Sequence, residues 1–345
     1  MTRIGIIGAG FMGTTHAAAW AGTGASVAAV IAGPDTPAAD LAERYGAAAH
    51  DDLDTFLASV DVVDVCAPTD LHERFVLAAA AAGKAVVCEK PLARTSQQGE
   101  RMLAACRANG VPLLVAQVVR FFPEYVAARE AVLTGAVGIP AVVRLTRATF
   151  QPRKAADNWF VDHARSGGLV FDLMIHDIDY ARWIAGDVAT VFARSVQGSR
   201  TEAPSDHALA ILRHRDGAIT HLEASWAQRP PTFRTAGEIA GDAGVVSWSS
   251  DESEPVRVDL EQPTDAAGEI PRVASTLAED PYTTQIRHFL RVLRGEEAPI
   301  VTGEDGLAAV RIAEAVATSI RTGRVVEVSG AEGTDDVGTD REVTR

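Results

Sequence analysis

The stretch Gly8-Ala9-Gly10-Phe11-Met12-Gly13 decides how the chain begins to fold. It leaves the apolar run Ile4–Ile7 and enters an alanine-rich segment of helical length, Thr14–Trp20. In this spacing, the first glycine permits a tight turn, the second lets the backbone approach a pyrophosphate, and the third lets the helix pack on the strand. The bare pattern also occurs in turns without a ligand. Its place between a buried strand and a helix predicts a dinucleotide-binding turn, with Phe11 and Met12 included in the cofactor site.

Residues 1–118 alternate short apolar runs with alanine-rich segments of helical length. Continuous apolar runs suit strands that are buried on both faces of a parallel sheet. Gly46, Gly83 and Gly110 each follow a helical segment, where a helix commonly ends. We therefore predict a doubly wound α/β sheet. The expected strands are Ile4–Ile7, Val27–Ala32, Val62–Ala67, Val86–Cys88 and Leu113–Ala116, and the expected helices are Thr14–Trp20, Pro37–Tyr45, His72–Ala82 and Gln97–Ala108.

After about residue 120 the strand-like segments become longer and alternate apolar with polar residues, which favours antiparallel hairpins. We predict a nucleotide-binding domain over 1–120, an α/β substrate domain over 121–328 and a disordered acidic tail over 329–345. In the second domain the expected helices are Glu124–Leu133, Tyr282–Leu293 and Gly303–Thr322, and the expected strands are Ala141–Thr149, Val188–Val196, His207–His214, Ile219–Trp226, Thr235–Ala240 and Val325–Val328.

The composition excludes several classes of partner. The 345 residues carry a formal net charge of −14, which argues against a general nucleic-acid binder or a polybasic membrane-surface protein. Residues 251–280 and 329–345 contribute most of this charge, so the acidity is local. No apolar stretch is long enough for a transmembrane helix, and the start does not resemble a signal peptide. Three widely spaced cysteines predict neither disulfides nor a metal site and fit a reducing cytoplasm.

The end of the second predicted strand bears on the choice of cofactor. An acidic residue there usually binds the adenosine ribose of NAD. This end reads Ile31-Ala32-Gly33-Pro34-Asp35. No acidic residue stands directly at the end of the strand, and Asp35 follows slightly beyond the usual position. The next basic residue is Arg44, whereas a 2′-phosphate needs a cation nearby. The sequence favours NAD, with Asp35 in the cofactor site, and leaves NADP open.

Glu89-Lys90-Pro91 follows the apolar run Val86–Cys88, at the carboxyl end of a parallel sheet, where doubly wound folds bind ligands. Pro91 favours an extended backbone at Lys90. A lysine there can hydrogen-bond a substrate hydroxyl and stabilise negative charge that develops on its oxygen. The alternative is an ordinary surface lysine in a loop.

Asp172, His176 and Asp179 form a second set of polar residues, after the pair Gly167-Gly168. Their i, i+4, i+7 spacing places them on one face of a predicted helix. Two carboxylates beside a histidine would raise its pKa and orient its ring, which suits a general base near neutral pH. A surface Asp–His pair and a metal site are the alternatives; the absence of further clustered Cys or His residues argues against the metal.

These motifs, in this order, resemble the glucose-fructose oxidoreductase / inositol dehydrogenase / MocA family over nearly the whole chain. The segments that carry the resemblance are Gly8–Gly13, Cys66–His72, Glu89–Pro91, Gly167–Asp179, Asn158–Phe160 and Ser225-Trp226. The resemblance implies a Rossmann domain followed by an α/β domain with a large, mostly antiparallel sheet, whose open face forms a homodimer or homotetramer interface. It also implies NAD(P)-dependent oxidation or reduction of a sugar, a cyclitol such as inositol, or a related polyol.

The resemblance also implies roles for particular residues. Lys90, Asp172 and His176 match the catalytic positions, with His176 as the general acid/base and Lys90 polarising the reacting oxygen. The implied cofactor contacts beyond the glycine turn are Ala67, Pro68, Thr69, His72, Glu89, Lys90 and Gln117, and the implied substrate contacts are Lys90, Arg120, Asn158, Trp159, Asp172 and His176. Two departures from the family pattern are the missing acid near Asp35 and the bulky Met174, which either narrows the pocket or faces the core.

Two other functions compete with a dehydrogenase. Some relatives of the fold keep NAD bound and cleave glycosidic bonds through a transient oxidation, and a second alternative is a non-catalytic dinucleotide-binding regulator. The presence of Lys90, Asp172 and His176 together argues against the regulator.

Overall fold

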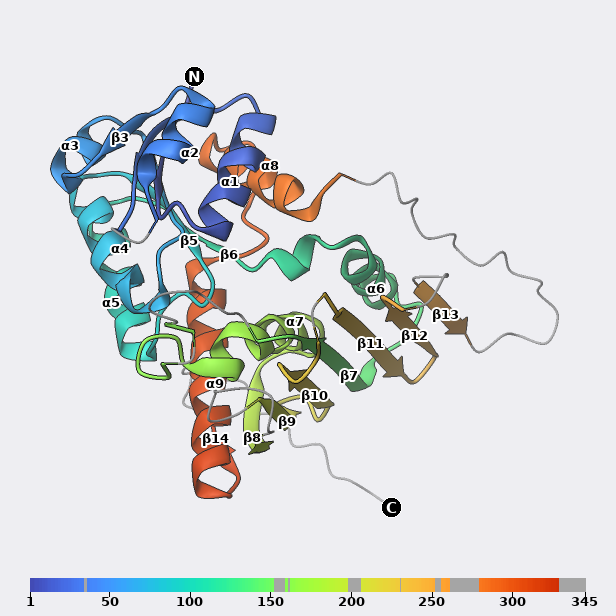
Figure 1. Cartoon of the computed structure of the whole chain (residues 1–345). Helices are drawn as coiled ribbons and strands as arrows, with labels where there is room; N and C mark the ends of the chain where they lie inside the picture. Colours follow the sequence, from blue (N-terminus) through green and yellow to red (C-terminus); the bar gives the residue numbers. More distant parts are fainter. Residues whose placement is uncertain are drawn as a thin grey trace, which may run out of the picture.

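Two sheets organise the chain (Figure 1). The computed structural model describes residues 1–33, 36–151, 159–160, 162–197, 206–229, 231–251, 256–260 and 279–328. The first sheet belongs to the N-terminal part and the second to the C-terminal part, as the sequence predicts. Among the helices described, none is both long and apolar enough to span a bilayer.

The first sheet has six parallel strands in the order β3-β2-β1-β4-β5-β6. The strand order reverses direction between β1 and β4, and doubly wound folds bind dinucleotides at such a point. This confirms the predicted Rossmann sheet. The prediction missed the short strand β3 and the helix α3. The strands are β1 (Arg3–Ile7), β2 (Ser26–Ile31), β3 (Ala48–His50), β4 (Val62–Val65), β5 (Ala85–Glu89) and β6 (Leu113–Ala116).

Five α-helices connect these strands, as expected where parallel strands need crossovers. The predicted glycine stop after the second helix is confirmed, because Gly46 adopts the left-handed conformation with φ of 64°. The helices are α1 (Phe11–Gly22), α2 (Ala38–Tyr45), α3 (Leu53–Ala58), α4 (His72–Ala81) and α5 (Ser96–Ala108).

The second sheet has eight strands in the order β13-β12-β11-β7-β10-β9-β8-β14. Its pairs are antiparallel except β7 with β10, so the mostly antiparallel sheet is confirmed with one parallel pair. β12 and β13 were not among the predicted strands. The strands are β7 (Pro140–Thr149), β8 (Val188–Val196), β9 (His207–His214), β10 (Ile219–Ser225), β11 (Phe233–Gly241), β12 (Gly244–Ser249), β13 (Val256–Leu260) and β14 (Val326–Glu327).

Helices cover one face of this sheet. α7 (Ile175–Ala185) packs on β7, and α9 (Gly303–Thr322) packs on β8. α6 (Pro123–Leu133) lies against β12. The strands therefore alternate buried and exposed side chains, most regularly along β9.

The chain returns to its N-terminal half near the end. α8 (Pro281–Leu293), orange in Figure 1, packs against α1, which is blue. Ile286 and Phe289 of α8 share one hydrophobic cluster with Trp20 of α1. The domain boundary at residue 120 stays a prediction, but α8 lies on the first sheet's side of the molecule. Most of the acidic stretch 251–280, and the whole tail 329–345, lie outside the described residues; β13 of that stretch is an edge strand.

Candidate active site

The glycine turn has the geometry of a phosphate-binding loop. Gly8 adopts φ of +106°, and a Cβ on Gly13 would lie 1.8 Å from the Gly8 carbonyl oxygen, so both positions need glycine. A Cβ on Gly10 would meet no protein atom within 4 Å, which leaves open space beside the turn. α1 begins here with no side-chain cap, so its first N–H groups are free for an anion. These features fit the pyrophosphate of a dinucleotide.

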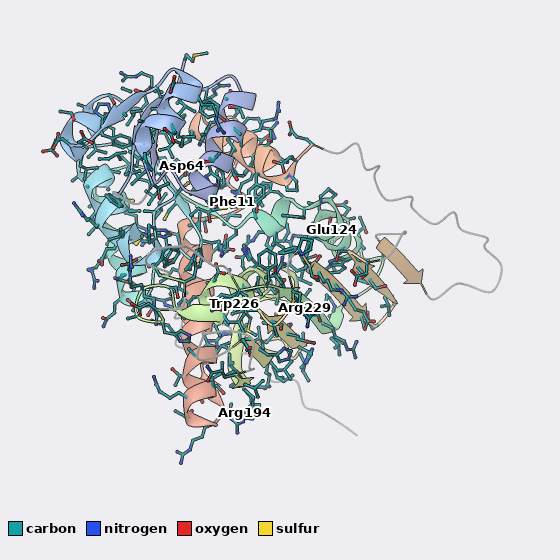
Figure 2. The ribbon with its side chains drawn as sticks, in the orientation of Figure 1. Phe11, Asp64, Glu124, Arg194, Trp226 and Arg229 are labelled. Atoms are coloured by element: carbon teal, nitrogen blue, oxygen red, sulfur yellow. The ribbon has the colours of Figure 1, made fainter. Side chains whose placement is uncertain are left out.

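The side of the turn that faces solvent carries Phe11. This side chain is 80% exposed at the first residue of α1. In Figure 2, Phe11 and Asp64 both lie in the N-terminal half, with Phe11 nearer to the second sheet. Met12 follows Phe11 in the first turn of the helix.

Lys90 follows the last residue of β5 and reaches across to the C-terminal half. Its Nζ donates to the backbone oxygen of Asp172 at 2.6 Å and to Oδ1 of the same residue at 3.1 Å. Both side chains are mostly buried, with 14% and 21% exposed. The ion pair therefore joins the carboxyl edge of the first sheet to the segment before α7.

Asp172 does not lie on a regular α-helix. The segment Val170–Met174 forms a π-helical turn, and α7 begins only at Ile175. The prediction that Asp172, His176 and Asp179 share one face of a regular helix is therefore wrong at Asp172, because a π turn changes the angular spacing of the side chains. Such turns are frequent at functional sites. Met174 is fully buried, which settles its orientation toward the core.

His176 lies in the first turn of α7 and is half-buried. Its Nδ1 is buried and has no hydrogen-bond partner among the described residues. Burial, together with the nearby cations Lys90 and Arg147, lowers the pKa of His176 well below its usual value. The expectation that two carboxylates raise this pKa is wrong, because Asp172 pairs with Lys90 and Asp179 pairs elsewhere.

Asp179 binds Arg120, away from His176. The two side chains form a bidentate ion pair with N–O distances of 2.7 and 2.6 Å, and each is 1% exposed. Arg120 also donates to the Ile300 carbonyl and approaches Asp305 at the start of α9. This contradicts the expectation that Arg120 meets the substrate, because its guanidinium is buried and bound to Asp179, Ile300 and Asp305. It joins the end of β6 to α7 and α9.

His72 and Glu89 are buried in contacts with the protein itself, contrary to the expectation that they contact the cofactor. The ring nitrogens of His72 lie 2.9 Å from the carbonyl oxygens of Pro91 and Ala67. Burial lowers the pKa of this histidine. Glu89 is 6% exposed, and its Oε2 accepts the Lys90 backbone N–H at 2.8 Å. His72 and Glu89 therefore hold the loops that carry the site.

Gln117 directly follows the last residue of β6. Glu89 of β5 pairs in register with Ala116 of β6, so Gln117 and Lys90 each follow the last paired residue of neighbouring strands. Gln117 is fully buried, and its amide oxygen and nitrogen lack partners among the residues described. An unpaired buried amide is costly, and a polar ligand group would supply the missing partners, so the cofactor contact expected of Gln117 stays a prediction.

Tyr282, in the first turn of α8, was missed by the sequence reasoning. Burial raises the pKa of its phenol, and the Glu89 carboxylate and the His16 cation also act on it. Tyr282 is half-buried in α8, the helix that packs against α1 of the N-terminal half. Only a helix that returns to the first sheet could bring it there, and no local pattern reveals such a return.

The remaining predicted residues are distributed as follows. Ala67, Pro68 and Thr69 form the loop after β4, with a 3₁₀ turn over Thr69–Leu71. Trp159 stacks on Phe160 with ring centroids 4.1 Å apart. Asp35 and Asn158 lie outside the described residues, so their roles stay predictions.

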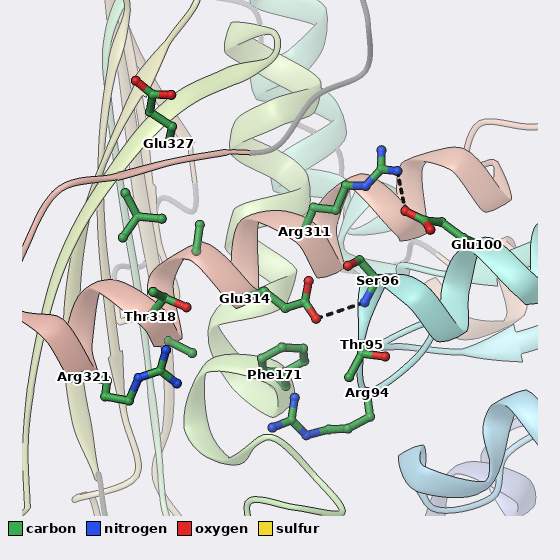
Figure 3. Close-up of a pocket in the computed structure, with 13 residues that line it drawn as sticks. Arg94, Thr95, Ser96, Glu100, Phe171, Arg311, Glu314, Thr318, Arg321 and Glu327 are labelled. Carbon is green, nitrogen blue, oxygen red and sulfur yellow. Dashed lines mark hydrogen bonds and ion pairs between the residues drawn. The ribbon is translucent and has the colours of Figure 1, made fainter.

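A cavity of about 540 Å³ lies elsewhere in the molecule, between the start of α5, the π turn and α9 (Figure 3). Glu314 accepts the Ser96 backbone N–H there, and Arg311 pairs with Glu100. Arg94 stacks on Phe171. The cavity contains none of the predicted site residues, and its arginines are matched by three glutamates, so we assign it no ligand.

Comparisons with known proteins agree with this architecture. A family model described as an oxidoreductase family with an NAD-binding Rossmann fold matches residues 2–117, and the C-terminal domain model of the same family matches residues 125–247. An inositol 2-dehydrogenase of Saccharopolyspora erythraea is 30% identical over 94% of this chain and 95% of that protein.

Two further relatives are similar over nearly their whole length. A D-apiose dehydrogenase of Paraburkholderia graminis is 29% identical over 95% of this chain and 90% of that protein. A levoglucosan dehydrogenase solved with NADH and L-sorbose superimposes with a TM-score of 0.85 at 22% identity, covering 96% of this chain and 99% of that one, which supports the shared fold.

The fold and the glycine turn, together with these matches, define a two-domain oxidoreductase with a Rossmann domain that binds NAD. The chain belongs to the glucose-fructose oxidoreductase / inositol dehydrogenase / MocA family.

Proposed function

We propose that this protein is an NAD-dependent dehydrogenase that oxidises a hydroxyl of a sugar or an inositol-like polyol. The observation that supports it best is the contact between Lys90 and Asp172, one turn before His176, at the carboxyl edge of the sheet that holds the glycine turn. The names of the related inositol and apiose dehydrogenases support the substrate class.

The proposed chemistry divides between three side chains. NAD, when bound, supplies the acceptor for the hydride that leaves the substrate carbon. His176 is neutral at neutral pH because of its lowered pKa, and it accepts the hydroxyl proton through Nε2, since Nδ1 is buried. Lys90 donates a hydrogen bond to the reacting oxygen and stabilises its charge. Asp172 holds the Lys90 ammonium in place.

The buried polar groups near Lys90 complete the proposed cofactor site. The unpartnered amide of Gln117 offers a donor and an acceptor. The loop Ala67–Thr69 and the glycine turn hold the rest of the dinucleotide. NAD is favoured over NADP because the nearest basic residue after β2 is Arg44.

A screen of inositols, monosaccharides and anhydrosugars with NAD and with NADP tests this proposal. We expect a net rise in nicotinamide absorbance with at least one neutral polyol and NAD, and a rise at least about a hundredfold slower for His176→Ala. Product formation from a glycoside without a net absorbance change would instead identify a glycoside-cleaving enzyme. Binding of NADH without turnover of any compound would favour a regulator.

We also propose that the open face of the second sheet binds a second copy of the chain. Large apolar side chains are exposed there on three neighbouring strands, β8, β9 and β10, and such patches mark interaction surfaces. These residues are Phe192, Leu209, Ile211 and Ile219, which are 37–47% exposed. Light scattering after size-exclusion chromatography should show a dimer or tetramer that Ile211→Lys dissociates.

A further inference from the structure

A buried group of charged residues lies under the candidate site. It consists of His16 on α1, Asp64 on β4 and Glu89 at the end of β5, and all three are almost fully buried. The proposed chemistry uses none of these side chains directly. Burying a charge is costly unless it is paired, so the arrangement of the three requires an explanation.

His16 lies between the two carboxylates. Its Nδ1 is 2.9 Å from Oδ2 of Asp64, and its Nε2 is 3.1 Å from Oε1 of Glu89, at ion-pair distance but without the alignment of a hydrogen bond. Burial opposes the charged ring, but the Asp64 carboxylate outweighs it, and the pKa of His16 is raised well above its usual value. The ring is therefore a cation between two anions.

Asp64 is held firmly on its other sides. Trp20 donates its indole N–H to Oδ2 at 2.7 Å, and the Cys66 thiol lies 3.5 Å from Oδ1. His16, Asp64 and Cys66 place their donor atoms within 4.8 Å of one another, a spacing that a metal could also use. Because the histidine and the carboxylate already hydrogen-bond one another, and burial raises the pKa of the Cys66 thiol, we interpret the cluster as a hydrogen-bond network.

Glu89 connects this network to the candidate site. While Oε1 faces His16, Oε2 accepts the backbone N–H of Lys90 at 2.8 Å. Lys90 in turn extends its Nζ to Asp172. Contacts therefore run from Asp64 through His16 and Glu89 to the backbone of the residue whose ammonium defines the site.

We propose that His16 is a positioning residue for Lys90: it orients the Glu89 carboxylate, which anchors the Lys90 backbone and so directs the ammonium toward Asp172. The inference rests on the proposed function, because it assumes that the placement of Lys90 matters for turnover. The groups that face His16 are Asp64 and Cys66 from the β4 side and Glu89 from β5.

The test uses His16→Gln, Glu89→Gln and the double variant in the full-length enzyme. We expect each single change to lower kcat by about tenfold to a hundredfold, the range that a small misplacement of a reacting group produces, with little change in KM for NAD. The double variant should lose no more than the worse single variant, since both act through Glu89. Trp20→Phe is the matched control: it removes a hydrogen bond from the same buried cluster and should keep kcat near that of the wild type.

A second readout does not need a substrate. The chain has only three lysines, Lys84, Lys90 and Lys154, so acylation of each is readily followed by peptide mass spectrometry. Lys84 donates to the Val60 carbonyl, outside the cluster, and serves as the internal reference. We expect Lys90 to be acylated faster relative to Lys84 in both single variants, because its ammonium is no longer held against Asp172. If His16→Gln does not fold, Glu89→Gln, which keeps the size of the side chain, carries both readouts.

Two outcomes would overturn the inference. The first is a kcat of Glu89→Gln equal to that of the wild type. The second is a double variant whose loss of kcat is the product of the two single losses, together with an unchanged rate of Lys90 acylation. Lys90→Met separates this failure from a failure of the proposed function. If Lys90→Met turns over like the wild type, the proposed role of Lys90 is wrong, and the labelling ratio alone still decides whether His16 positions it.

Discussion

The Nζ atom of Lys90 lies 2.6 Å from the backbone oxygen of Asp172 and 3.1 Å from its carboxylate. This contact joins residues 82 positions apart, one directly after strand β5 of the first sheet and one from the segment before α7. The proposed reacting groups therefore come from both halves of the chain. Their distance depends on how the halves pack, which makes the surrounding buried ion pairs relevant to turnover.

Removal of the proposed base, His176, should lower the turnover rate without weakening the binding of the cofactor. We expect His176→Ala to lower kcat by about 10²–10⁴, the typical contribution of general acid–base catalysis. NADH binding, measured by fluorescence titration, should stay close to the wild type because the glycine turn is untouched. Turnover at the wild-type rate would show that another group accepts the proton.

The pH profile should reflect the lowered pKa of His176. A general base works only when neutral, and burial with Lys90 and Arg147 lowers this pKa below the usual value. In alcohol oxidation, kcat should therefore stay flat down to about pH 6.5 and fall only in more acidic solution. Loss of half the activity above that pH would contradict the assignment.

Replacement of the buried pair Arg147–Asp177 probes the same pKa. Arg147 donates to Asp177 at 2.9 and 2.7 Å. The double variant Arg147→Gln, Asp177→Asn therefore removes the cation without leaving an unpaired anion. The pKa of His176 should rise, and the acidic limb of the kcat profile should move to higher pH. An unmoved limb would mean that Arg147 does not act on the base.

The glycine turn offers two matched substitutions with opposite expectations. Gly10→Ala should fold like the wild type, because its Cβ meets no protein atom, but should weaken NADH binding by crowding the phosphates. Gly13→Ala should lower the melting temperature, because its Cβ would lie 1.8 Å from the Gly8 carbonyl oxygen. Thermal melts with and without NADH separate the two. Unchanged NADH affinity in Gly10→Ala would place the phosphates elsewhere.

Substitution of Arg120 tests whether this residue stabilises the fold or contacts the substrate. Arg120→Met leaves Asp179 buried without a partner, so we expect the free energy of unfolding in urea to fall by about 3–5 kcal/mol. Arg3→Met, in the exposed pair with Asp61, is the control and should change stability little. A raised KM for the polyol with unchanged stability would instead support the substrate role expected from the sequence.

The sequence predicts most of the fold because the apolar runs are continuous and well separated by segments of helical length. Strand β1 and the glycine turn follow directly from local pattern, and so do α5 and α9. Strand β3, with the residues Ala-Ala-His, is too short and too weakly apolar for such a pattern. The parallel pairing of β7 with β10 depends on which distant strands meet, and no local signal encodes it.

The site was predicted less completely than the fold. Lys90 and Asp172 meet as the motifs suggest, but the partners of Asp179, His72 and Glu89 could not be read from spacing. Spacing assumes a regular helix, and the π turn before α7 breaks that assumption. A side chain's partner also depends on the other strand ends, as the position of His16 between Asp64 and Glu89 illustrates.

The packing of α8 on α1 has a practical consequence for engineering. The buried side of α1 is completed by Ile286 and Phe289, which the ribosome adds long after residue 120. A fragment that ends near residue 120 would therefore expose an apolar strip on the nucleotide-binding half. Chimeras that exchange this half between related dehydrogenases should transplant residues 281–293 with it.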